Sequence, residues 1–326
     1  MKLTNLGNTK VVTIGGGTGH FSILNGLKRI AISRDNVKAI VSTLDNGGSS
    51  GKLITQYGVL PPGDIRNCMI ALSDESQILA DLFNYRFNEE FNNHNFGNLF
   101  ITILNEITDD FEKAIEITSK ILRIRGEIIP VSLDSNNLIA ETNLGEKIVG
   151  ETQIDKSTNK KIKKIYLENN EMSSNPKALD AISNADYVII GPGDLYTSSI
   201  PNLLFNDIKN SLQNTSAKKI LVVNVMSKPG ETDGYYVENF IEEIQNYMGT
   251  SLDYIIVNRN YPDEEIVDKH RREENKHPIE LKKNSDIDKR IQIYDLINED
   301  NVVRHSPEKL SKAILDIISK DKDSKM

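Results

Sequence analysis

The sequence predicts a doubly wound α/β fold built on a mostly parallel sheet. Two observations predict it. Short runs of β-branched and other apolar residues recur along the 326-residue chain, and amphipathic stretches follow several of them. Continuous apolar runs of this length are typical of strands buried on both faces, as in a parallel sheet. The alternation of strand and helix then places helices on both faces of that sheet.

The expected elements follow the chain in order. Six apolar runs are expected to form strands: residues 11–14, 37–43, 187–191, 219–225, 253–258 and 291–297. A helix is expected at about 20–30, after the first strand, and amphipathic stretches predict three more helices, at residues 201–213, 234–248 and 307–320. Pro201 suits the first position of its helix.

Two regions interrupt this alternation. Residues 63–124 are expected to form a helical insertion, with helices near 64–73, 76–86, 97–107 and 110–123. Residues 128–168 show short strand-like runs with turn residues between them, which predicts a small antiparallel β meander. No long linker separates these parts, so we expect one domain over residues 1–320. The charged tail 321–326 is expected to fray.

Composition limits the function. The chain has 39 basic and 47 acidic side chains and a net charge of −8, so it lacks the broad basic field of a non-specific nucleic-acid binder. Its one cysteine, Cys68, cannot form an internal disulfide, so nothing points to secretion. The first apolar run is too short for a signal peptide or a membrane span. We expect a cytoplasmic protein.

A glycine-rich loop follows the first strand. It consists of Gly15, Gly16, Gly17, Thr18 and Gly19. A helix N-terminus after such a loop offers free N–H groups and a partial positive charge, which favours a phosphate or nucleotide. His20 stands where a P-loop needs lysine, and where a dinucleotide fingerprint needs glycine. A strand–helix turn without a ligand stays an alternative.

A second loop follows the strand at 37–43, at the edge where open α/β sheets bind ligands. It contains Asp45, Asn46, Gly47, Gly48, Ser49 and Ser50. Its glycines and serines supply many hydrogen-bond donors, and Asp45 is a candidate ligand for a metal or for a hydroxyl group. The alternative is a flexible surface loop.

Two further motifs lie in the helical insertion. In the run from Pro61 to Asn67, Asp64 is placed to cap a helix, and Arg66 and Asn67 are candidates for phosphate binding. The segment from His94 to Leu99 contains Asn98 near a helix start. A single histidine is more often structural than catalytic, so His94 is not chosen as a base.

Two more loops follow strands later in the chain. One contains Gly191, Gly193, Asp194, Ser198 and Ser199, and the other begins at Asn224. Several such loops on one edge of a sheet are stronger evidence than any one of them. Together they predict a cleft for a large polar ligand.

This set of motifs resembles the CofD/YvcK family of 2-phospho-L-lactate transferase-like proteins, and most closely the YvcK branch of gluconeogenesis factors. The resemblance is carried by motifs in the same order: GGGTG, DNGGSSGKL, GVLPPGDIRN, HNFGN, GPGDLYTSSIPNLL and NVMSKPGETDGY. It extends from about residue 10 to 320. It implies a Rossmann-like core and a cytoplasmic bacterial protein.

The two branches of the family imply different functions. The CofD branch transfers a phospholactate unit from a nucleoside diphosphate donor with the help of a divalent metal. The YvcK branch implies a regulator that binds a nucleotide sugar and acts in cell shape, envelope synthesis and gluconeogenic growth. Relatives carry Asp-Asp where this chain has Asp45-Asn46, which weakens the case for a metal. His270 aligns with a tyrosine of relatives, and Arg304 is a candidate for contact with a diphosphate or a base.

Three hypotheses remain. The first is a regulator that binds a UDP-sugar with little or no need for Mg²⁺, because glycine-loop N–H groups, Arg66 and Arg304 supply positive charge. The second is a metal-assisted transferase, with Asp45 and Asp64 as catalytic residues and Mg²⁺ on Asp45. The third and weaker hypothesis is NAD binding. GDP also stays open as a ligand, and so does a homo-oligomer as the assembled state.

Overall fold

The computed structural model of the chain describes residues 4–158, 160–259, 264–282, 288–298 and 303–324. Within them, seven parallel strands form one sheet in the order β10-β9-β8-β7-β1-β2-β3. The strands are β1 (Val11–Gly15), β2 (Val37–Val41), β3 (Glu127–Pro130), β7 (Tyr187–Ile190), β8 (Lys218–Val222), β9 (Tyr254–Asn258) and β10 (Ile291–Tyr294). The predicted α/β class is confirmed.

The strand order reverses between β1 and β7. From β1 the chain adds β2 and β3 on one side, and from β7 it adds β8, β9 and β10 on the other. In open α/β sheets, the crevice beyond the carboxyl ends of the strands at such a reversal is the usual place for a ligand. The loops that follow β1 and β7 are two of the predicted glycine-rich loops. The topology therefore places them side by side.

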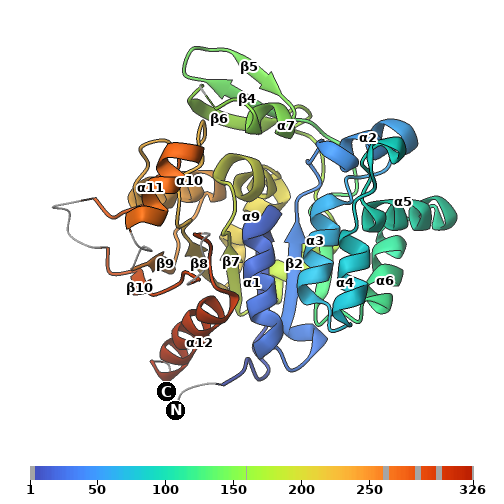
Figure 1. Cartoon of the computed structure of the whole chain (residues 1–326). Helices are drawn as coiled ribbons and strands as arrows, with labels where there is room; N and C mark the ends of the chain where they lie inside the picture. The colour runs from blue at the N-terminus through green and yellow to red at the C-terminus, as the bar shows by residue number, and fades with distance from the viewer. Residues whose placement is uncertain (1–3, 159, 260–263, 283–287, 299–302, 325–326) are drawn as a thin grey trace.

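Helices cover both faces of the sheet, because alternate strand residues point to opposite sides. Val11 belongs to the core under one layer, and Val12 belongs to the core under the other. The first layer contains α1 (Gly17–Ile30), α3 (Gly63–Leu72) and α12 (Pro307–Asp323). The second contains α8 (Pro176–Ser183), α9 (Asn206–Asn214) and α10 (Val237–Met248). Figure 1 shows α1 and α12 in front of the sheet.

The region between β2 and β3 is helical, as the sequence predicts. Besides α3, it contains α2 (Gly48–Tyr57), α4 (Gln77–Asn84), α5 (Phe96–Thr108) and α6 (Phe111–Ile121). These helices lie beyond the β2–β3 side of the sheet (Figure 1). No helix in the described part of the chain is long and apolar enough to cross a membrane.

The antiparallel sheet is smaller than predicted. It contains β4 (Leu138–Thr142), β5 (Lys147–Val149) and β6 (Ile162–Leu167), with the short helix α7 (Glu151–Asp155) between the last two. The predicted meander 128–168 was wrong at its beginning, because β3 pairs in parallel with β2. Three of the four residues of β3 are buried, so this run completes the edge of the main sheet.

The C-terminal segment is also more ordered than expected. We expected fraying over 321–326, but α12 continues to Asp323; residues 325–326 lie outside the described part. Asp321 is buried and accepts hydrogen bonds from the hydroxyls of Tyr187 (2.8 Å) and Tyr254 (3.0 Å). These two bonds attach the last turn to β7 and β9.

The helix predicted at residues 201–213 begins later than expected. Pro201 lies in a 3₁₀ turn (Ile200–Leu203), and α9 starts only at Asn206.

Candidate functional site

A cleft of about 520 Å³ opens at the carboxyl ends of β1, β7 and β8, where the strand order reverses; we call it the central cleft. The part of the chain that the structure describes brings ten of the predicted site residues into its wall. They are Gly17, Thr18, Gly19, Asp45, Asp64, Gly193, Asp194, Ser198, Asn224 and Arg304. Their binding roles stay predictions, but the fold gathers them from six separate segments of the chain.

The first glycine loop brings the N-terminus of α1 to the central cleft. Gly16 precedes this helix and has no capping side chain, the first turn contains no acidic residue, and the Gly17 N–H interacts with the carboxyl group of Asp64. A Cβ at Gly16 would lie 2.5 Å from Oδ2 of Asp64, and one at Gly19 would lie 2.5 Å from the carbonyl oxygen of Pro192. The glycines therefore let this loop approach both Asp64 and the loop after β7 closely.

His20 supports this loop from behind. It is fully buried, its Nε2 lies 2.8 Å from Oγ1 of Thr13, and its Nδ1 lies 3.7 Å from Sγ of Cys68. Burial lowers the pKa of His20 to about 4, so its ring is neutral at pH 7. The residue that excludes the P-loop motif is a packing residue beneath Gly15.

Carboxyl groups crowd the wall of the cleft beside the first glycine loop. Burial, with neighbouring Asp45 next, raises the pKa of Asp64 to about 7, while the Gly17 N–H opposes the shift. The pKa of Asp45 is also raised, chiefly by burial, although its Oδ1 accepts a 2.8 Å hydrogen bond from the Gly47 N–H. Burial, with Asp45 and Asp155 next, raises the pKa of Glu151 to about 8. Burial raises the pKa of each of these three acids, and each of Asp64 and Glu151 is raised further by the charge of Asp45.

The same carboxyl groups suit a divalent cation of the kind that the family implies. Asp45 and Asp64 offer the hard oxygen ligands that Mg²⁺ prefers, and neither is neutralised by an ion pair among the described residues. The guanidinium of Arg66 opposes the rise in the pKa of both carboxyl groups, and its own pKa is lowered to about 10 by burial and by Arg86. Asp45 and Asp64 are therefore the residues that would hold such an ion.

The other predicted residues support the central cleft from outside its wall. Ser49 Oγ lies 3.2 Å from His94 Nδ1 and accepts a hydrogen bond from the Asn95 N–H. Arg66 donates to Oδ1 of Asn67, 2.5 Å away, and is buried. The predicted residues that do not line the cleft are Gly15, Gly16, Asn46, Gly47, Gly48, Ser49, Ser50, Arg66, Asn67, Asn98, Gly191 and Ser199.

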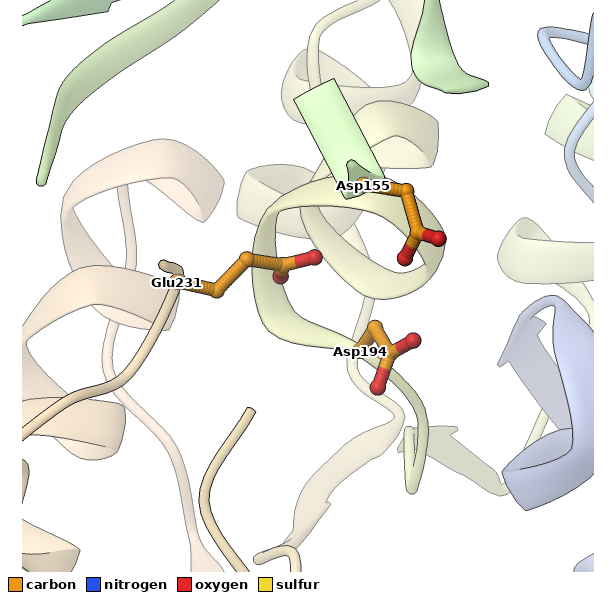
Figure 2. Close-up of side chains that lie close together, drawn as sticks. All are labelled: Asp155, Asp194 and Glu231. Carbon is orange, nitrogen blue, oxygen red and sulfur yellow. The ribbon is translucent and has the colours of Figure 1, made fainter. Parts of the chain in front are cut away.

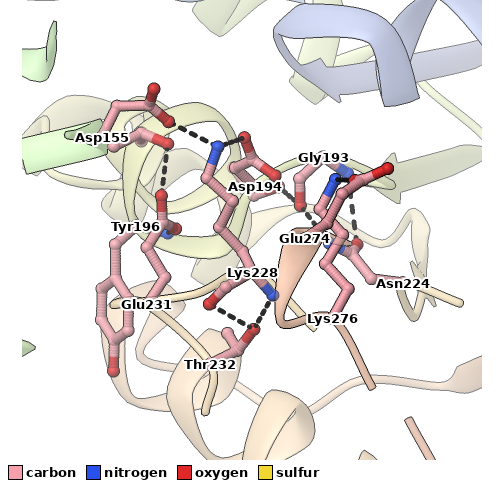
Figure 3. A network of polar contacts seen from close by, with 12 residues as sticks. Asp155, Gly193, Asp194, Tyr196, Asn224, Lys228, Glu231, Thr232, Glu274 and Lys276 are labelled. Atoms are coloured by element: carbon pink, nitrogen blue, oxygen red, sulfur yellow. Dashed lines mark hydrogen bonds and ion pairs between the residues drawn. The ribbon is translucent and has the colours of Figure 1, made fainter. Parts of the chain in front are cut away.

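An ion-pair cluster at the β7–β8 side was missed from the sequence. The carboxyl groups of Asp155, Asp194 and Glu231 point toward one another (Figure 2). Lys228 Nζ lies 2.6 Å from Asp155 and 3.3 Å from Asp194 (Figure 3). Burial alone would lower the pKa of Lys228, but the surrounding carboxylates raise it above its ordinary value. Lys228 thus ties α7 to the loop after β7.

Glu231 has a different role in this cluster. It accepts hydrogen bonds from the Tyr196 N–H (2.8 Å) and the Thr197 hydroxyl (2.7 Å), at the start of the short turn η3 (Leu195–Ser199). Burial raises its pKa to about 7. Lys228 and Glu231 lie in the predicted loop that begins at Asn224, so that motif was the available signal. Glu151 and Asp155 lie in the meander, and no motif marked them.

The far end of the central cleft contains two histidines. His270, on α11 (Glu264–Glu274), and His305 are both buried, and each Nε2 has no hydrogen-bond partner among the described residues. Burial lowers the pKa of His305 to about 4. Arg304 is exposed beside them, and the floor includes Val225 and Val303. This end combines apolar surface with unsatisfied ring nitrogens.

Comparisons of the chain with known proteins all point to one family. A model described as 2-phospho-L-lactate transferase CofD matches residues 11–297. A relative from Aquifex aeolicus is 41% identical over 97% of this chain and 98% of its own length. A relative from Halalkalibacterium halodurans, named gluconeogenesis factor, is 37% identical over 94% of this chain and 95% of its own. A solved structure from Bacillus halodurans, a UPF0052 family member, has a TM-score of 0.87 at 35% identity and covers 94% of this chain and 99% of its own.

Proposed function

The chain belongs to the CofD family, and we propose that its central cleft binds a nucleotide sugar, with a UDP-sugar as the first candidate. In this proposal the protein is a gluconeogenesis factor-like regulator, in which ligand binding is linked to cell shape and envelope synthesis during gluconeogenic growth. The relatives named gluconeogenesis factor support this general role. The nucleotide and the cellular process are our inferences.

The observation that carries the proposal is the N-terminus of α1 at the reversal of the strand order, where Gly16 has no capping side chain and the Gly17 N–H interacts with Asp64. The next N–H groups, of Thr18 and Gly19, have no acceptor within the helix and keep a partial positive charge for an anion. Thr18 and Gly19 line the central cleft at this point. A diphosphate would receive hydrogen bonds there, as anions do at other helix N-termini.

The far end of the cleft suits the base. His270 and His305 each have a buried Nε2 without a described partner, and a base edge offers both donors and acceptors to such atoms. The guanidinium of Arg304 can stack on an aromatic ring or contact a phosphate. The cleft volume of about 520 Å³ is within the usual range of small-molecule sites. The sugar would then lie within reach of the carboxyl groups that line the cleft.

The charge of the cleft changes our expectation about Mg²⁺. From the sequence we expected binding with little need for it, partly because of Arg66, but Arg66 is buried outside the cleft wall. Among the described lining residues, six carboxyl groups face three cationic side chains, and two of those three are in ion pairs. A diphosphate would meet net negative charge. We therefore propose that Mg²⁺ held by Asp45 and Asp64 strengthens binding.

A second candidate function is the metal-assisted transfer of a phospho-organic group of the 2-phospho-L-lactate type. The observation in its favour is the partly buried pair Asp45 and Asp64, whose raised pKa values indicate a site short of positive charge. A bound Mg²⁺ would supply neutralisation of the departing nucleotide phosphate. NAD binding is a weaker candidate, because Asp45, the acidic residue after β2, already accepts the Gly47 N–H.

Calorimetric titration with UDP-N-acetylglucosamine tests the proposal. We expect saturable binding of one ligand per chain, stronger with Mg²⁺ than in EDTA, and no consumption of the ligand by phosphorus NMR. Free N-acetylglucosamine, GDP and NAD serve as comparison ligands. Slow hydrolysis or group transfer would instead favour the transferase, and preferential binding of NAD would favour the third hypothesis. If none of the nucleotides binds, the proposed function is wrong.

The base end has its own test. Arg304→Ala is expected to weaken UDP-sugar binding about tenfold, the size of one charge-assisted contact. Its melting temperature should not change, since Arg304 is exposed. Lys309→Ala is the matched control, because Lys309 is a partly exposed cation on α12 that pairs with Asp295 outside the central cleft. Equal losses of affinity in both variants would mean that the base does not bind at this end of the cleft.

A further inference from the structure

Lys228 is a cation in the wall of the central cleft to which the proposed function gives no role. It belongs to the loop that begins at Asn224, between β8 and α10. Its Nζ lies 2.6 Å from Oδ1 of Asp155 on α7 and 3.3 Å from Oδ2 of Asp194 in the loop after β7 (Figure 3). Both carboxylates line the same cleft. The ammonium group therefore lies at the cleft surface, between two segments that it joins.

The backbone of Lys228 is held in place by a buried turn. Its N–H donates to Oγ1 of Thr232 at 2.8 Å, and its carbonyl accepts the N–H groups of Thr232 (2.9 Å) and Glu231 (3.1 Å). Thr232 is fully buried, and Pro229 restricts the next position of the turn. A lysine side chain, in contrast, has a flexible four-carbon stem. The ammonium group can therefore change partners while the backbone stays where it is.

The ion pairs of Lys228 are open to exchange. The side chains of Asp155 and Asp194 are each 39% exposed, and that of Lys228 is 23% exposed. An ion pair this open to water contributes only about a factor of three to an equilibrium constant. Burial lowers the pKa of Lys228, but the two carboxylates raise it above its ordinary value, so the ammonium group is charged at neutral pH. A diphosphate, which carries more charge than either carboxylate, can compete for it.

Lys228 also lies close to the proposed anion site. Its partner Asp194 accepts the N–H of Ser198 at its backbone carbonyl, at 2.9 Å. A Cβ at Gly17 would lie only 3.3 Å from Oγ of Ser198, so the first glycine loop lies directly against this turn. Lys228 therefore contacts the same turn that contacts the N-terminus of α1.

The other cations of the cleft lie elsewhere. Among the described lining residues they are Lys276 and Arg304. The N–H of Lys276 donates to the carbonyl of His270 at 3.3 Å, and Arg304 directly precedes His305. Both cations therefore belong to the far end, where we place the base. Among these residues, Lys228 is the cation beside the expected position of the diphosphate.

We propose that Lys228 binds the diphosphate of the ligand, and that Asp155 and Asp194 hold its ammonium group when the cleft is empty. The class of ligand, a diphosphate in the central cleft, rests on the proposed function. Ligand binding exchanges one anionic partner of the ammonium group for another and changes no covalent bond. The exchange also removes the ion pair between α7 and the loop that contains Lys228. Binding of the diphosphate thus loosens this attachment of α7.

Two substitutions that break the same ion pair test this role. Lys228→Met removes the ammonium group, so it should weaken the binding of UDP-N-acetylglucosamine and of inorganic pyrophosphate about tenfold. Asp155→Asn removes a competitor of the ligand, so it should strengthen the binding of both about threefold. A purely structural ion pair is lost in both variants. It would therefore change the affinity in the same direction in both, which would overturn the proposal.

A double variant and a control complete the test. Asp155→Asn also removes one negative charge from the cleft, and this general effect persists when Lys228 is absent. The gain from Asp155→Asn should therefore be smaller in a Lys228→Met background than in the parent. Lys218→Met is the matched control, because Lys218 pairs with Asp253 at 2.8 Å outside the central cleft and its side chain is 35% exposed. Equal gains in both backgrounds, or an equal loss in the control, would overturn the proposal.

Calorimetric titration at one fixed Mg²⁺ concentration measures these affinities, and the two probes separate two kinds of failure. Opposite effects of Lys228→Met and Asp155→Asn on either probe support the role of Lys228. If pyrophosphate shows them but UDP-N-acetylglucosamine does not bind, the role stands and the nucleotide-sugar proposal is wrong. If the parent binds UDP-N-acetylglucosamine and both variants shift its affinity in one direction, only the role of Lys228 is wrong. If the parent binds neither probe, both proposals are wrong.

Discussion

The loops after β1 and β7 have similar sequences but different structural roles. Both are rich in glycine and hydroxyl residues, both follow a buried strand of the same sheet, and both reach the central cleft. At the N-terminus of α1, the N-cap residue Gly16 has no side chain and the Gly17 N–H interacts with the Asp64 carboxyl group, while the N–H groups of Thr18 and Gly19 have no acceptor within the helix. At the second loop, Glu231 already accepts the N–H of Tyr196, and the N–H groups of Ser198 and Ser199 donate to the carbonyl of Asp194.

This difference separates a binding loop from a supporting one. Backbone donors that already have protein partners cannot also bind a phosphate without losing those bonds. We therefore place the diphosphate on the first loop. The second loop contributes side chains, chiefly Asp194 and Ser198, which line the central cleft. The sequence pattern alone does not distinguish these roles, because the group that occupies the second loop comes from 35 residues farther along the chain.

The largest expected effect is at the first loop. The backbone of Gly16 is extended, so Gly16→Ala introduces no strain of its own, but its Cβ would lie 2.5 Å from Oδ2 of Asp64. Displacing Asp64 next to the anion site should weaken UDP-sugar binding about 100-fold, or ~2.7 kcal/mol. The folded state should persist, as circular dichroism can verify.

A double-mutant cycle on affinity separates this contact from other causes. In an Asp64→Ala background the carboxylate is gone, so adding Gly16→Ala should cost little more. Fully additive losses would mean that Gly16 acts through something other than Asp64. Unchanged binding in the single variant would contradict the assignment of the first loop.

The second loop should respond mainly in stability. Glu231→Ala leaves the Tyr196 N–H and the Thr197 hydroxyl without their acceptor in a buried site. Losing a buried acceptor of this kind costs about 2–3 kcal/mol, and denaturant unfolding measures it. Glu231→Gln retains one oxygen and should cost less. If Glu231→Ala weakens UDP-sugar binding more than Gly16→Ala does, the two loops have the opposite roles.

These roles show how far the sequence could predict the site. The glycine loops could be predicted because strand, loop and helix follow one another directly in the sequence, so a local sequence pattern identifies them. The acidic wall was found only in part: Glu151 and Asp155 reach the cleft because the meander packs against it, and nothing near them in the sequence marks this. Likewise, the sequence does not show whether the short run at β3 joins the main parallel sheet or the small antiparallel sheet. Its parallel pairing with β2 places it in the main sheet.

The two carboxyl groups Glu151 and Glu231 should make the ligand-free protein less stable at high pH. Each has a folded-state pKa above its unfolded value, about 8 and about 7 against 4.5. Such a group binds its proton more tightly in the folded state, so its contribution is complete below about pH 4.5 and is lost as pH rises through 7 and 8. Melting temperature should fall by several degrees between pH 6 and 9.

Glu151→Gln identifies the source of this effect. The amide is neutral at every pH, so the fall should be smaller in this variant than in the parent over the whole range: between pH 7 and 9 little of it should remain, and between pH 6 and 7 only the part that comes from Glu231 and Asp64, whose pKa values are about 7, should remain. Glu146→Gln serves as the control, because Glu146 is exposed in the meander and pairs with Lys160. A parent whose melting temperature is independent of pH over this range would contradict the crowding of these acids.

The smallest expected effect concerns Asn46, which stands where the family resemblance implies a second aspartate. The sequence comparison predicts that this difference removes a charge suited to a metal. In the structure, Asn46 lies outside the cleft wall, and its Oδ1 accepts the Thr152 N–H at 3.0 Å, at the start of α7. An aspartate could accept the same bond.

Asn46→Asp should therefore change UDP-sugar affinity, with or without Mg²⁺, by no more than about twofold, or ~0.5 kcal/mol. Asp45→Asn, the adjacent change inside the cleft, should abolish the gain from Mg²⁺. If Asn46→Asp greatly increases the dependence of binding on Mg²⁺, then this side chain is one of the metal ligands. In that case α7, which Asn46 contacts, would have to move when the metal binds.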